Sequence, residues 1–398
     1  MDETKHPMES APQVTATRTP SGALPAGLRP TAADRPGVAQ PVPVRDIPAL
    51  PWNRVFATAL VLFVAMVAGW ELYWRDFGVE PSYRNSDGQW AEQRRRIDRG
   101  DGGRTVLIGA SRMLFDVQLP TWERLAGERP IQLAMEGTSP IPVLEDLAGD
   151  ANFTGRLLIG VTPHVFFAGA MYRDQLFTYY RTQTVAQRIG DWLSMTFLEP
   201  YVAFYDPDYA LATMVQRQPW PQRAGLAERI VPRKLVLHDY DRNTYLWNKV
   251  TDDPEYHALV RSIWQRNFAR PVGQILPGMD TPEKKRKGID EQIGRAATAI
   301  AKLRARGVPV VFLRPPSSGP IHDFEDRELP RAETWDLLLA RTGAPGIHFE
   351  DYPELQGDEL PEWSHLSAPD AERFTAALVP IAEREFSRQE SRSGAVAR

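Results

Sequence analysis

The chain has 398 residues, of which 42% are hydrophobic and 25% charged, so it is long enough for one large globular domain or two small ones. Its formal net charge of −4 lacks the positive excess that nucleic-acid binding needs, so no nucleic-acid partner is expected. The absence of cysteine excludes thiolate nucleophiles, disulfides and cysteine-ligated metals.

The N-terminal segment 1–52 is predicted to be a disordered cytoplasmic tail. Ten of the 35 prolines fall within the first 51 residues, among Ala, Thr, Gly and charges of both signs, and no apolar periodicity runs through them. A segment of this composition cannot bury enough apolar surface to offset the entropy lost on folding.

An apolar stretch follows and predicts one transmembrane helix at 53–75. Twenty residues lie between Arg54 and Arg75, and at roughly 1.5 Å per helical residue they span about 30 Å, the thickness of a hydrocarbon core. A buried core helix or a cleaved signal peptide fits less well, because the run is long and begins far from the N-terminus. We therefore expect the lipid bilayer to be a partner through residues 55–74.

The basic residues around this stretch predict its orientation. Six Lys and Arg residues precede the span, whereas only Arg75 and Arg84 follow it closely, which favours a cytoplasmic N-terminus. This orientation makes the chain a single-pass membrane protein with its main domain extracytoplasmic. In a Gram-negative bacterium this means anchoring in the inner (cytoplasmic) membrane and a periplasmic domain.

After a predicted connector at 76–103, short apolar strands alternate with helices. The predicted strands are 105–109, 131–135, 156–161, 308–313 and 346–350, and the predicted helices are 119–126, 140–149, 285–306, 333–343 and 367–386. Such alternation predicts an α/β domain with a parallel sheet, here over residues 104–390. A mainly helical insertion at about 168–280 interrupts the alternation and would cap the sheet, and a disordered tail is predicted at 391–398.

Polar residues at the carboxyl ends of the predicted strands form the candidate site, because ligands of open parallel sheets bind there. The sequence places the following residues at or near such ends: Ser111, Arg112, Gly137, Thr162, His164 and Arg314, with Glu362 and His365 after the last strand. A serine hydroxyl is a weak nucleophile that needs an imidazole to accept its proton and a carboxylate to orient the ring. The sequence therefore predicts a serine, histidine and carboxylate site at this edge.

These segments resemble the motif blocks of the SGNH (GDSL-like) hydrolase family, particularly its membrane-tethered bacterial members related to polysaccharide O-acetyltransferases. The resemblance covers about residues 100–390 apart from the insertion. It implies a three-layer, flavodoxin-like parallel sheet with a helical insertion, preceded by the one transmembrane helix. It also implies Ser111 as nucleophile, His365 as base and Glu362 as the third member of a triad, with an oxyanion hole built from the backbone N–H groups of Ser111 and Gly137.

Two positions depart from the family pattern. The third block normally supplies an oxyanion-hole asparagine, which is missing here, so Thr162 or His164 would have to replace it. Glu362 stands where aspartate is expected, and alternative partners of the histidine are Asp351 and Asp358.

Each candidate residue also has a purely structural interpretation. Ser111 is of a type that often caps helices, His365 could be bonded to a backbone carbonyl, and Gly137 could simply permit a tight turn. Arg112 and Arg314 could bind an anionic group of a sugar or could form an ion pair within the fold. The sequence has no HExxH, P-loop or Gly-x-Gly-x-x-Gly motif, so neither a metal nor a nucleotide cofactor is predicted.

Two functions remain open at this point. The first is a membrane-anchored, extracytoplasmic O-acyl (acetyl) transferase or esterase that acts on cell-envelope or secreted polysaccharide through a serine acyl-enzyme. Its implied partners are a polysaccharide or another hydroxyl-bearing acyl acceptor and a membrane acyl-donor protein. The alternative is a non-catalytic SGNH-like envelope scaffold or polysaccharide-assembly protein, which the missing asparagine favours because a fold does not guarantee its chemistry.

Overall fold

A computed structural model describes residues 50–218 and 233–396. Most of the tail predicted at 1–52 and the end of the tail predicted at 391–398 lie outside these described residues. The chain divides after Met66 into two compact units, which are described separately below.

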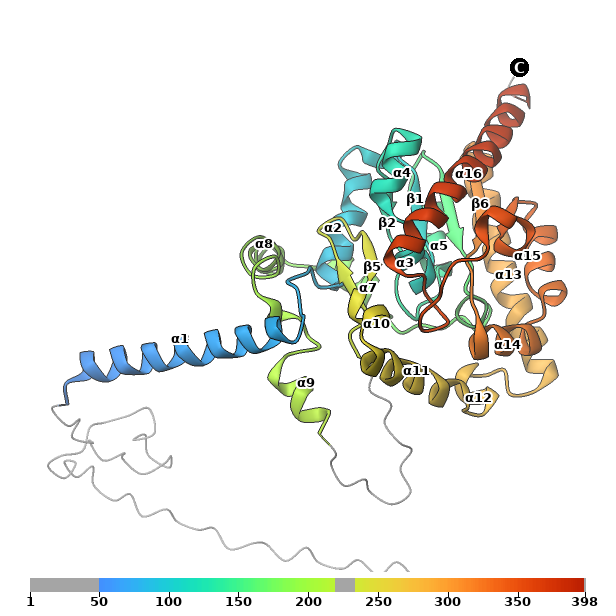
Figure 1. The fold of residues 1–398 in the computed structure, drawn as a ribbon. Coiled ribbons are helices and arrows are strands. Elements are labelled where there is room, and N and C mark those ends of the chain that lie inside the picture. Colours follow the sequence, from blue (N-terminus) through green and yellow to red (C-terminus); the bar gives the residue numbers. More distant parts are fainter. Residues whose placement is uncertain (1–49, 219–232, 397–398) are drawn as a thin grey trace, which may run out of the picture. The chain divides into compact units, whose positions relative to one another are not determined.

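Helix α1 (Trp52–Asp76) corresponds to the predicted span (Figure 1). Within the described residues it is the one helix that is long and apolar enough to cross a bilayer. Large apolar side chains such as Phe56, Leu60 and Val64 are exposed along it. The helix therefore has the length, composition and exposure that a membrane span requires.

A five-stranded parallel sheet forms the centre of the second unit, as the alternation of strands and helices predicts. Its strands are β1 (Val106–Ile108), β2 (Ile131–Gln132), β3 (Leu157–Gly160), β6 (Val310–Arg314) and β7 (Gly346–His348). They lie in the order β2-β1-β3-β6-β7, and every neighbouring pair is parallel. The strands are short runs of Val, Leu and Ile because both faces of the sheet are covered.

Helices cover the two faces and complete a three-layer α/β arrangement (Figure 1). One face packs against α5 (Ile141–Gly149), α13 (Pro282–Ala305) and α15 (Trp335–Thr342). The other face packs against α3 (Ser111–Asp116), α4 (Leu119–Ala126) and α16 (Ala368–Val396). Alternate strand residues enter the two cores: Val106 and Ile108 face the first, and Leu107 faces the second.

The segment predicted as a connector at 76–103 is part of the folded unit. It forms α2 (Asp87–Asp98) and the short helix η1 (Asp101–Gly103). Trp90 of α2 is fully buried and donates a hydrogen bond to the Leu133 carbonyl at 3.0 Å. At the other end of the chain, α16 continues as far as Val396, into the segment predicted as a tail.

The insertion is mainly helical, as expected, but it also contains a β-hairpin. It follows the short helix α6 (Pro163–Phe166), and its described helices are α7 (Leu176–Thr182), α8 (Val185–Phe197), η2 (Ala203–Tyr205), α9 (Leu211–Gln216), α10 (Asn248–Asp252), α11 (Pro254–Phe268) and α12 (Val272–Ile275). The hairpin pairs β4 (Val236–His238) with β5 (Thr244–Leu246). Arg242 in its turn is buried and donates hydrogen bonds to the carbonyls of Gln132 at 3.2 Å and Ala134 at 2.5 Å. The hairpin is thereby joined to the end of β2.

The remaining described elements follow β6 and β7. They are α14 (Gly319–Glu328) and the short helices η3 (Arg331–Glu333), η4 (Phe349–Asp351) and η5 (Pro353–Leu355). Helix α14 begins at the carboxyl end of β6, so its side chains are near the candidate site.

Candidate active site

Ser111 is the first residue of α3 and directly follows the turn at the end of β1. Strand β1 lies between β2 and β3, where the chain changes direction across the sheet, and such switch points are where open α/β sheets bind ligands. The turn requires glycine at position 109, because a Cβ there would lie 2.5 Å from the Cβ of Met113 and 3.2 Å from the Cα of Gly160. The close approach of α3 to β1 and β3 therefore places Ser111 at the sheet edge, where it is half-buried.

Gly137 lies in the loop after β2, beside the turn that carries Ser111. The Met135 N–H donates to the Gly109 carbonyl at 3.0 Å, which extends the pairing of β2 with β1 up to this loop. Gly137 has a φ of 56°, in the left-handed region that favours glycine. The Arg173 N–H donates to the Thr138 hydroxyl at 3.0 Å, so the insertion holds the loop in place. Gly137 thus has the turn role that its sequence position also allowed.

Thr162 and His164 were the two candidates for replacing the missing asparagine. Thr162 is buried at the N-cap of α6, at the carboxyl end of β3. The ring Nδ1 of His164 instead lies 2.7 Å from Oε1 of Glu325, in an ion-pair cluster. Because β2, β1 and β3 are neighbours in the sheet, the residues that follow them, Gly137, Ser111 and Thr162, lie at the same edge. His164 is bound to Glu325 instead.

His365 and Glu362 form a buried hydrogen-bonded pair. Nδ1 of His365 lies 2.6 Å from Oε1 of Glu362, and both side chains are buried. The two alternative carboxylates pair with arginines instead: Asp351 with Arg331 and Asp358 with Arg373. Glu362 is thus the carboxylate that orients the His365 ring, in the manner of the third residue of a triad.

The His365 ring packs on α3, the helix that begins with Ser111. It stacks on Phe115 with ring centroids 4.0 Å apart and an interplanar angle of 20°. Ser111 and Phe115 are four residues apart on α3 and therefore on the same face of that helix. Nε2 of His365 is buried and makes no hydrogen bond to any described residue, so the bond between Ser111 and His365 is not formed in this structure. Catalytic hydrogen bonds of this kind are often long or open in unliganded sites.

The loop that carries the histidine is held in a strained conformation. Trp363 has a φ of 71°, which is unusual for a bulky residue and is typical of functional loops fixed by their surroundings. Its carbonyl accepts a hydrogen bond from the Ser318 N–H at 3.0 Å. The Pro361 carbonyl is 2.6 Å from Nε of Arg261 and 2.7 Å from Nε2 of His257, both on α11. One helix of the insertion thereby positions the histidine loop.

The carboxyl edge of the sheet therefore carries Ser111 and the Gly137 turn, and the histidine–glutamate pair packs on α3 beside them. Neither a family model nor a curated protein matches this sequence. The assignment of the site therefore rests on the sequence motifs and on the geometry of this chain.

Arg112 and Arg314 each form an ion pair with Glu325 inside the fold. This is the structural alternative to binding an anionic group of a sugar. Arg112 binds both oxygens of Glu325 at 2.9 and 3.0 Å, and Arg314 donates to Oε2 of Glu325 at 2.7 Å. Burial raises the pKa of the Glu325 carboxyl, but Arg112, Arg314 and His164 outweigh burial and hold this pKa well below its usual range. Burial lowers the pKa of Arg314 to about 10. Nothing in the sequence pointed to Glu325, since it lies 213 positions from Arg112.

Asp116 is a second buried residue near the site that the sequence motifs did not indicate. It ends α3, and its Oδ1 accepts a hydrogen bond from the Leu366 N–H at 3.0 Å. Its Oδ2 is buried without a hydrogen-bond partner among the described residues. Burial raises the pKa of Asp116 well above the usual value, although the Leu366 N–H opposes this rise. Asp116 therefore connects the end of α3 with the histidine loop.

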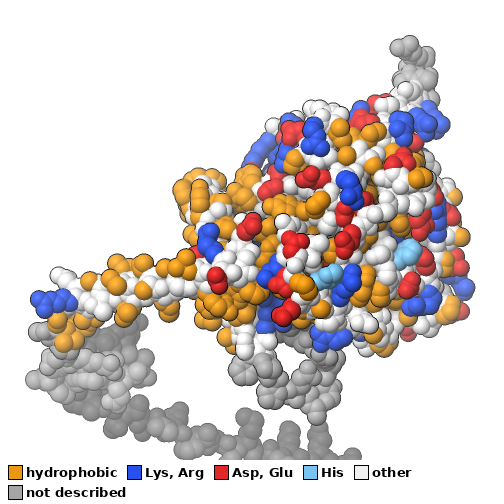
Figure 2. All heavy atoms as spheres, viewed as in Figure 1, with side chains coloured by type: hydrophobic (Ala, Val, Ile, Leu, Met, Phe, Trp, Pro, Cys, Tyr) orange, Lys and Arg blue, Asp and Glu red, His pale blue; other side chains and the backbone are white. Residues whose placement is uncertain are grey.

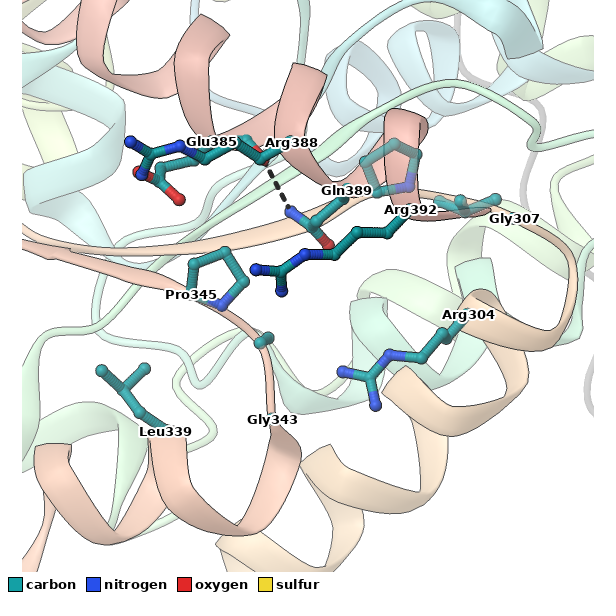
Figure 3. Close-up of a pocket in the computed structure, with 12 residues that line it drawn as sticks. Arg304, Gly307, Leu339, Gly343, Pro345, Glu385, Arg388, Gln389 and Arg392 are labelled. Carbon is teal, nitrogen blue, oxygen red and sulfur yellow. Dashed lines mark hydrogen bonds and ion pairs between the residues drawn. The ribbon is translucent and has the colours of Figure 1, made fainter. Parts of the chain in front are cut away.

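A separate cavity of about 640 Å³ opens at the opposite edge of the sheet (Figure 3). Its lining includes Pro309 and Pro345, which precede β6 and β7, together with residues of α16. Arg388 pairs with Glu385 at 2.6 Å, and Arg304 donates to a backbone carbonyl at 2.8 Å, so two of the arginines in this cavity already have partners. The cavity lies at the amino ends of the strands, whereas ligands of such sheets bind at the carboxyl ends. The described residues also contain no group of three potential metal ligands.

Proposed function

We propose that the chain is a membrane-anchored, extracytoplasmic O-acyltransferase or esterase with an SGNH-like site, acting on hydroxyl-bearing polysaccharide through a serine acyl-enzyme. The observation that carries this proposal is the buried pair of His365 and Glu362, whose imidazole ring stacks on Phe115, four residues after Ser111 on α3. The polysaccharide and the acyl group come from the family resemblance alone. The extracytoplasmic placement comes from the basic residues around α1, and the bacterial inner membrane comes from the family resemblance.

In the proposed mechanism, the Ser111 Oγ attacks the acyl carbon while its proton passes to Nε2 of His365. Glu362 holds the ring by Nδ1 and stabilises the imidazolium. The N–H groups of Ser111 and Gly137, with the Thr162 hydroxyl, donate to the oxyanion, whose stabilisation contributes about 3–4 kcal/mol per donor in characterised sites. The imidazolium then gives its proton to the leaving oxygen, and the acyl-enzyme remains.

In the second half-reaction, a sugar hydroxyl or water gives its proton to His365 and attacks the acyl carbon. Collapse of the intermediate returns that proton to Ser111 and releases the acylated sugar or the free acid. Transferase and esterase differ only in the acceptor. The mechanism requires the Ser111 hydroxyl to reach Nε2 of His365, and this is the contact that substrate binding has to complete.

Hydrolysis of p-nitrophenyl acetate by the detergent-solubilised full chain tests the proposal. Ser111→Ala should lower the rate by about three orders of magnitude or more, because the nucleophile is lost. Ser86→Ala is the matched control: the Ser86 hydroxyl accepts a hydrogen bond from the Gln89 N–H as the cap of α2, so its loss should cost about 1 kcal/mol of stability and leave the rate unchanged. A fluorophosphonate should also add its mass to Ser111. Equal hydrolysis by the wild-type chain and Ser111→Ala would contradict the proposal.

A non-catalytic envelope scaffold is the second candidate. The observation that favours it is Nε2 of His365, which is buried without a hydrogen bond from Ser111 or another described residue. A scaffold should show no fluorophosphonate labelling and should bind polysaccharide equally well with serine or alanine at position 111. Labelling of Ser111 would exclude this alternative.

A further inference from the structure

Helix α8 carries an apolar stripe on its exposed face. The stripe consists of Val185 (72% exposed), Ile189 (51%), Trp192 (54%), Leu193 (45%) and Phe197 (57%). Along the chain these residues are separated by four, three, one and four positions, a spacing that places them along one side of an α-helix. Figure 2 shows apolar side chains gathered at the place where Figure 1 labels α8. The amphipathic pattern is thus opposite to that of an ordinary surface helix, whose apolar side faces the core.

The other side of α8 is fixed to the protein. Ser194 and Met195 are buried, and Asp191 accepts hydrogen bonds from Tyr179 at 2.8 Å and Gln183 at 2.5 Å. The Thr184 capping box defines the start of the helix. The stripe is therefore held outward by packing on the opposite side, and contiguous exposed apolar surface of this kind marks an interaction site.

The segment after α8 is bound to the end of α1. The Glu71 carboxylate accepts hydrogen bonds from the N–H groups of Ala203 at 3.0 Å and Phe204 at 3.1 Å. Arg75 donates to the Tyr201 carbonyl at 2.8 Å. All of these residues belong to the unit that begins at Val67. The folded unit therefore begins at the last turns of the candidate span.

The length of the span places this attachment at the membrane surface. Only residues 55–70 lie between Arg54 and Glu71, and these sixteen residues cover about 24 Å as a helix, compared with a hydrocarbon core of about 30 Å. Glu71 is bound within the folded unit, so that unit must begin at the level of the lipid headgroups. Leu72 and Tyr73 beside it are also exposed.

We propose that α8 lies in the bilayer surface, with its apolar stripe among the lipid headgroups and upper acyl chains, as a second membrane contact in addition to α1. Trp, Leu and Phe on one face are typical of interfacial helices, and the exposed Arg188 of α8 supplies positive charge for anionic lipids. Two contacts fix the orientation of the domain on the membrane, which a single span alone does not. The inference does not depend on the catalytic proposal.

Single-cysteine labelling of the full chain tests this inference, since the chain contains no cysteine of its own. Ile189→Cys and Leu193→Cys carry a spin label on the stripe, and Leu337→Cys is the matched control. Leu337 is also an exposed apolar residue, but it lies on a different part of the fold. Its helix α15 packs on α13, whereas α8 packs on α2, next to β2. Each variant is reconstituted into vesicles of phosphatidylethanolamine and phosphatidylglycerol.

For each label, the measured quantity is the ratio of its accessibility to dissolved oxygen to its accessibility to a water-soluble nickel complex. This ratio should be several-fold higher at positions 189 and 193 than at position 337. Lipids that carry a spin label in the upper acyl chain should quench a fluorophore at 189 but not at 337. Equal accessibility at the three positions would overturn the proposal. Shielding of 189 from both reagents, or dipolar broadening between labels, would show a protein partner or a second copy on the stripe and would overturn it as well.

Discussion

Asp116 is a carboxyl group with one hydrogen bond and a second oxygen buried without a partner among the described residues. Because its pKa in the folded state lies above that in the unfolded chain, the native state holds the proton more tightly. The folded state is therefore favoured at low pH, and this contribution is lost as the pH rises above the ordinary aspartate pKa toward the raised one. Near neutral pH, Asp116 costs stability.

We predict that Asp116→Asn raises the thermal unfolding midpoint at pH 7, because the amide keeps an acceptor for the Leu366 N–H and carries no charge. The gain should shrink as the pH is lowered toward 4, where the wild-type carboxyl is protonated in the folded state. Circular dichroism of the solubilised full chain at a series of pH values measures it. A gain that does not vary with pH would show that charge burial is not the cause.

The pKa of Glu325 is shifted in the opposite direction to that of Asp116. Its pKa is lowered because Arg112, Arg314 and His164 outweigh burial, so its contribution to stability is present above the ordinary glutamate pKa and is lost as the pH falls through the lowered value. The cluster leaves neither arginine as an isolated charge beside Ser111. A substrate anion would have to compete for Arg112 with the buried Glu325 carboxylate, which accepts two hydrogen bonds from this arginine.

At the scale of elements, the turn between β1 and α3 depends on the absence of side chains at Gly109 and Gly160. A Cβ at Gly160 would lie 2.8 Å from the Cβ of Met113, and one at Gly109 would lie 2.5 Å from the same atom. Contacts this short force α3 away from the sheet. Since Ser111 and Phe115 are both on α3, a shift of this helix moves the proposed nucleophile and the ring that stacks on His365 together.

We predict that Gly109→Ala destabilises the chain by about 1–3 kcal/mol through overpacking and also lowers ester hydrolysis. Gly149→Ala is the matched control, because a Cβ at the end of α5 meets no atom within 4 Å. It should be neutral or stabilising by up to about 1 kcal/mol, since alanine favours helix. Urea unfolding of both variants measures the difference. Similar unfolding curves would show that the turn can relax.

At the scale of the whole molecule, the last turns of α1 are also part of the core of the folded unit. Trp74 of α1 is buried, and its ring centroid lies 4.4 Å from that of Tyr209 in the insertion. Together with the hydrogen bonds of Glu71, this contact makes the last turns of α1 a structural element of the folded unit.

We predict that Trp74→Ala lowers the free energy of unfolding of the full chain by about 3–5 kcal/mol, as the loss of a buried tryptophan commonly does. Leu72→Ala, two residues away but exposed, should change it by no more than about 0.5 kcal/mol in detergent. Urea unfolding followed by tryptophan fluorescence measures both. Equal effects would show that the end of α1 is not part of the cooperative core.

The sequence by itself determined the elements whose signals are local. The apolar run of α1, the short Val, Leu and Ile strands and helix α4 at 119–126 follow from composition and periodicity within a few residues. The serine and the Glu-x-x-His segment were likewise visible, because each motif is contiguous in the chain.

Only the tertiary structure decided which distant residues meet. It selected Glu362 over Asp351 and Asp358 as the partner of His365, and it paired Arg112 with Glu325. It also showed that α2 is packed within the domain and that the apolar side of α8 is exposed. Periodicity shows that a helix has an apolar side but not what covers that side, because burial depends on contacts between segments that are far apart in the sequence.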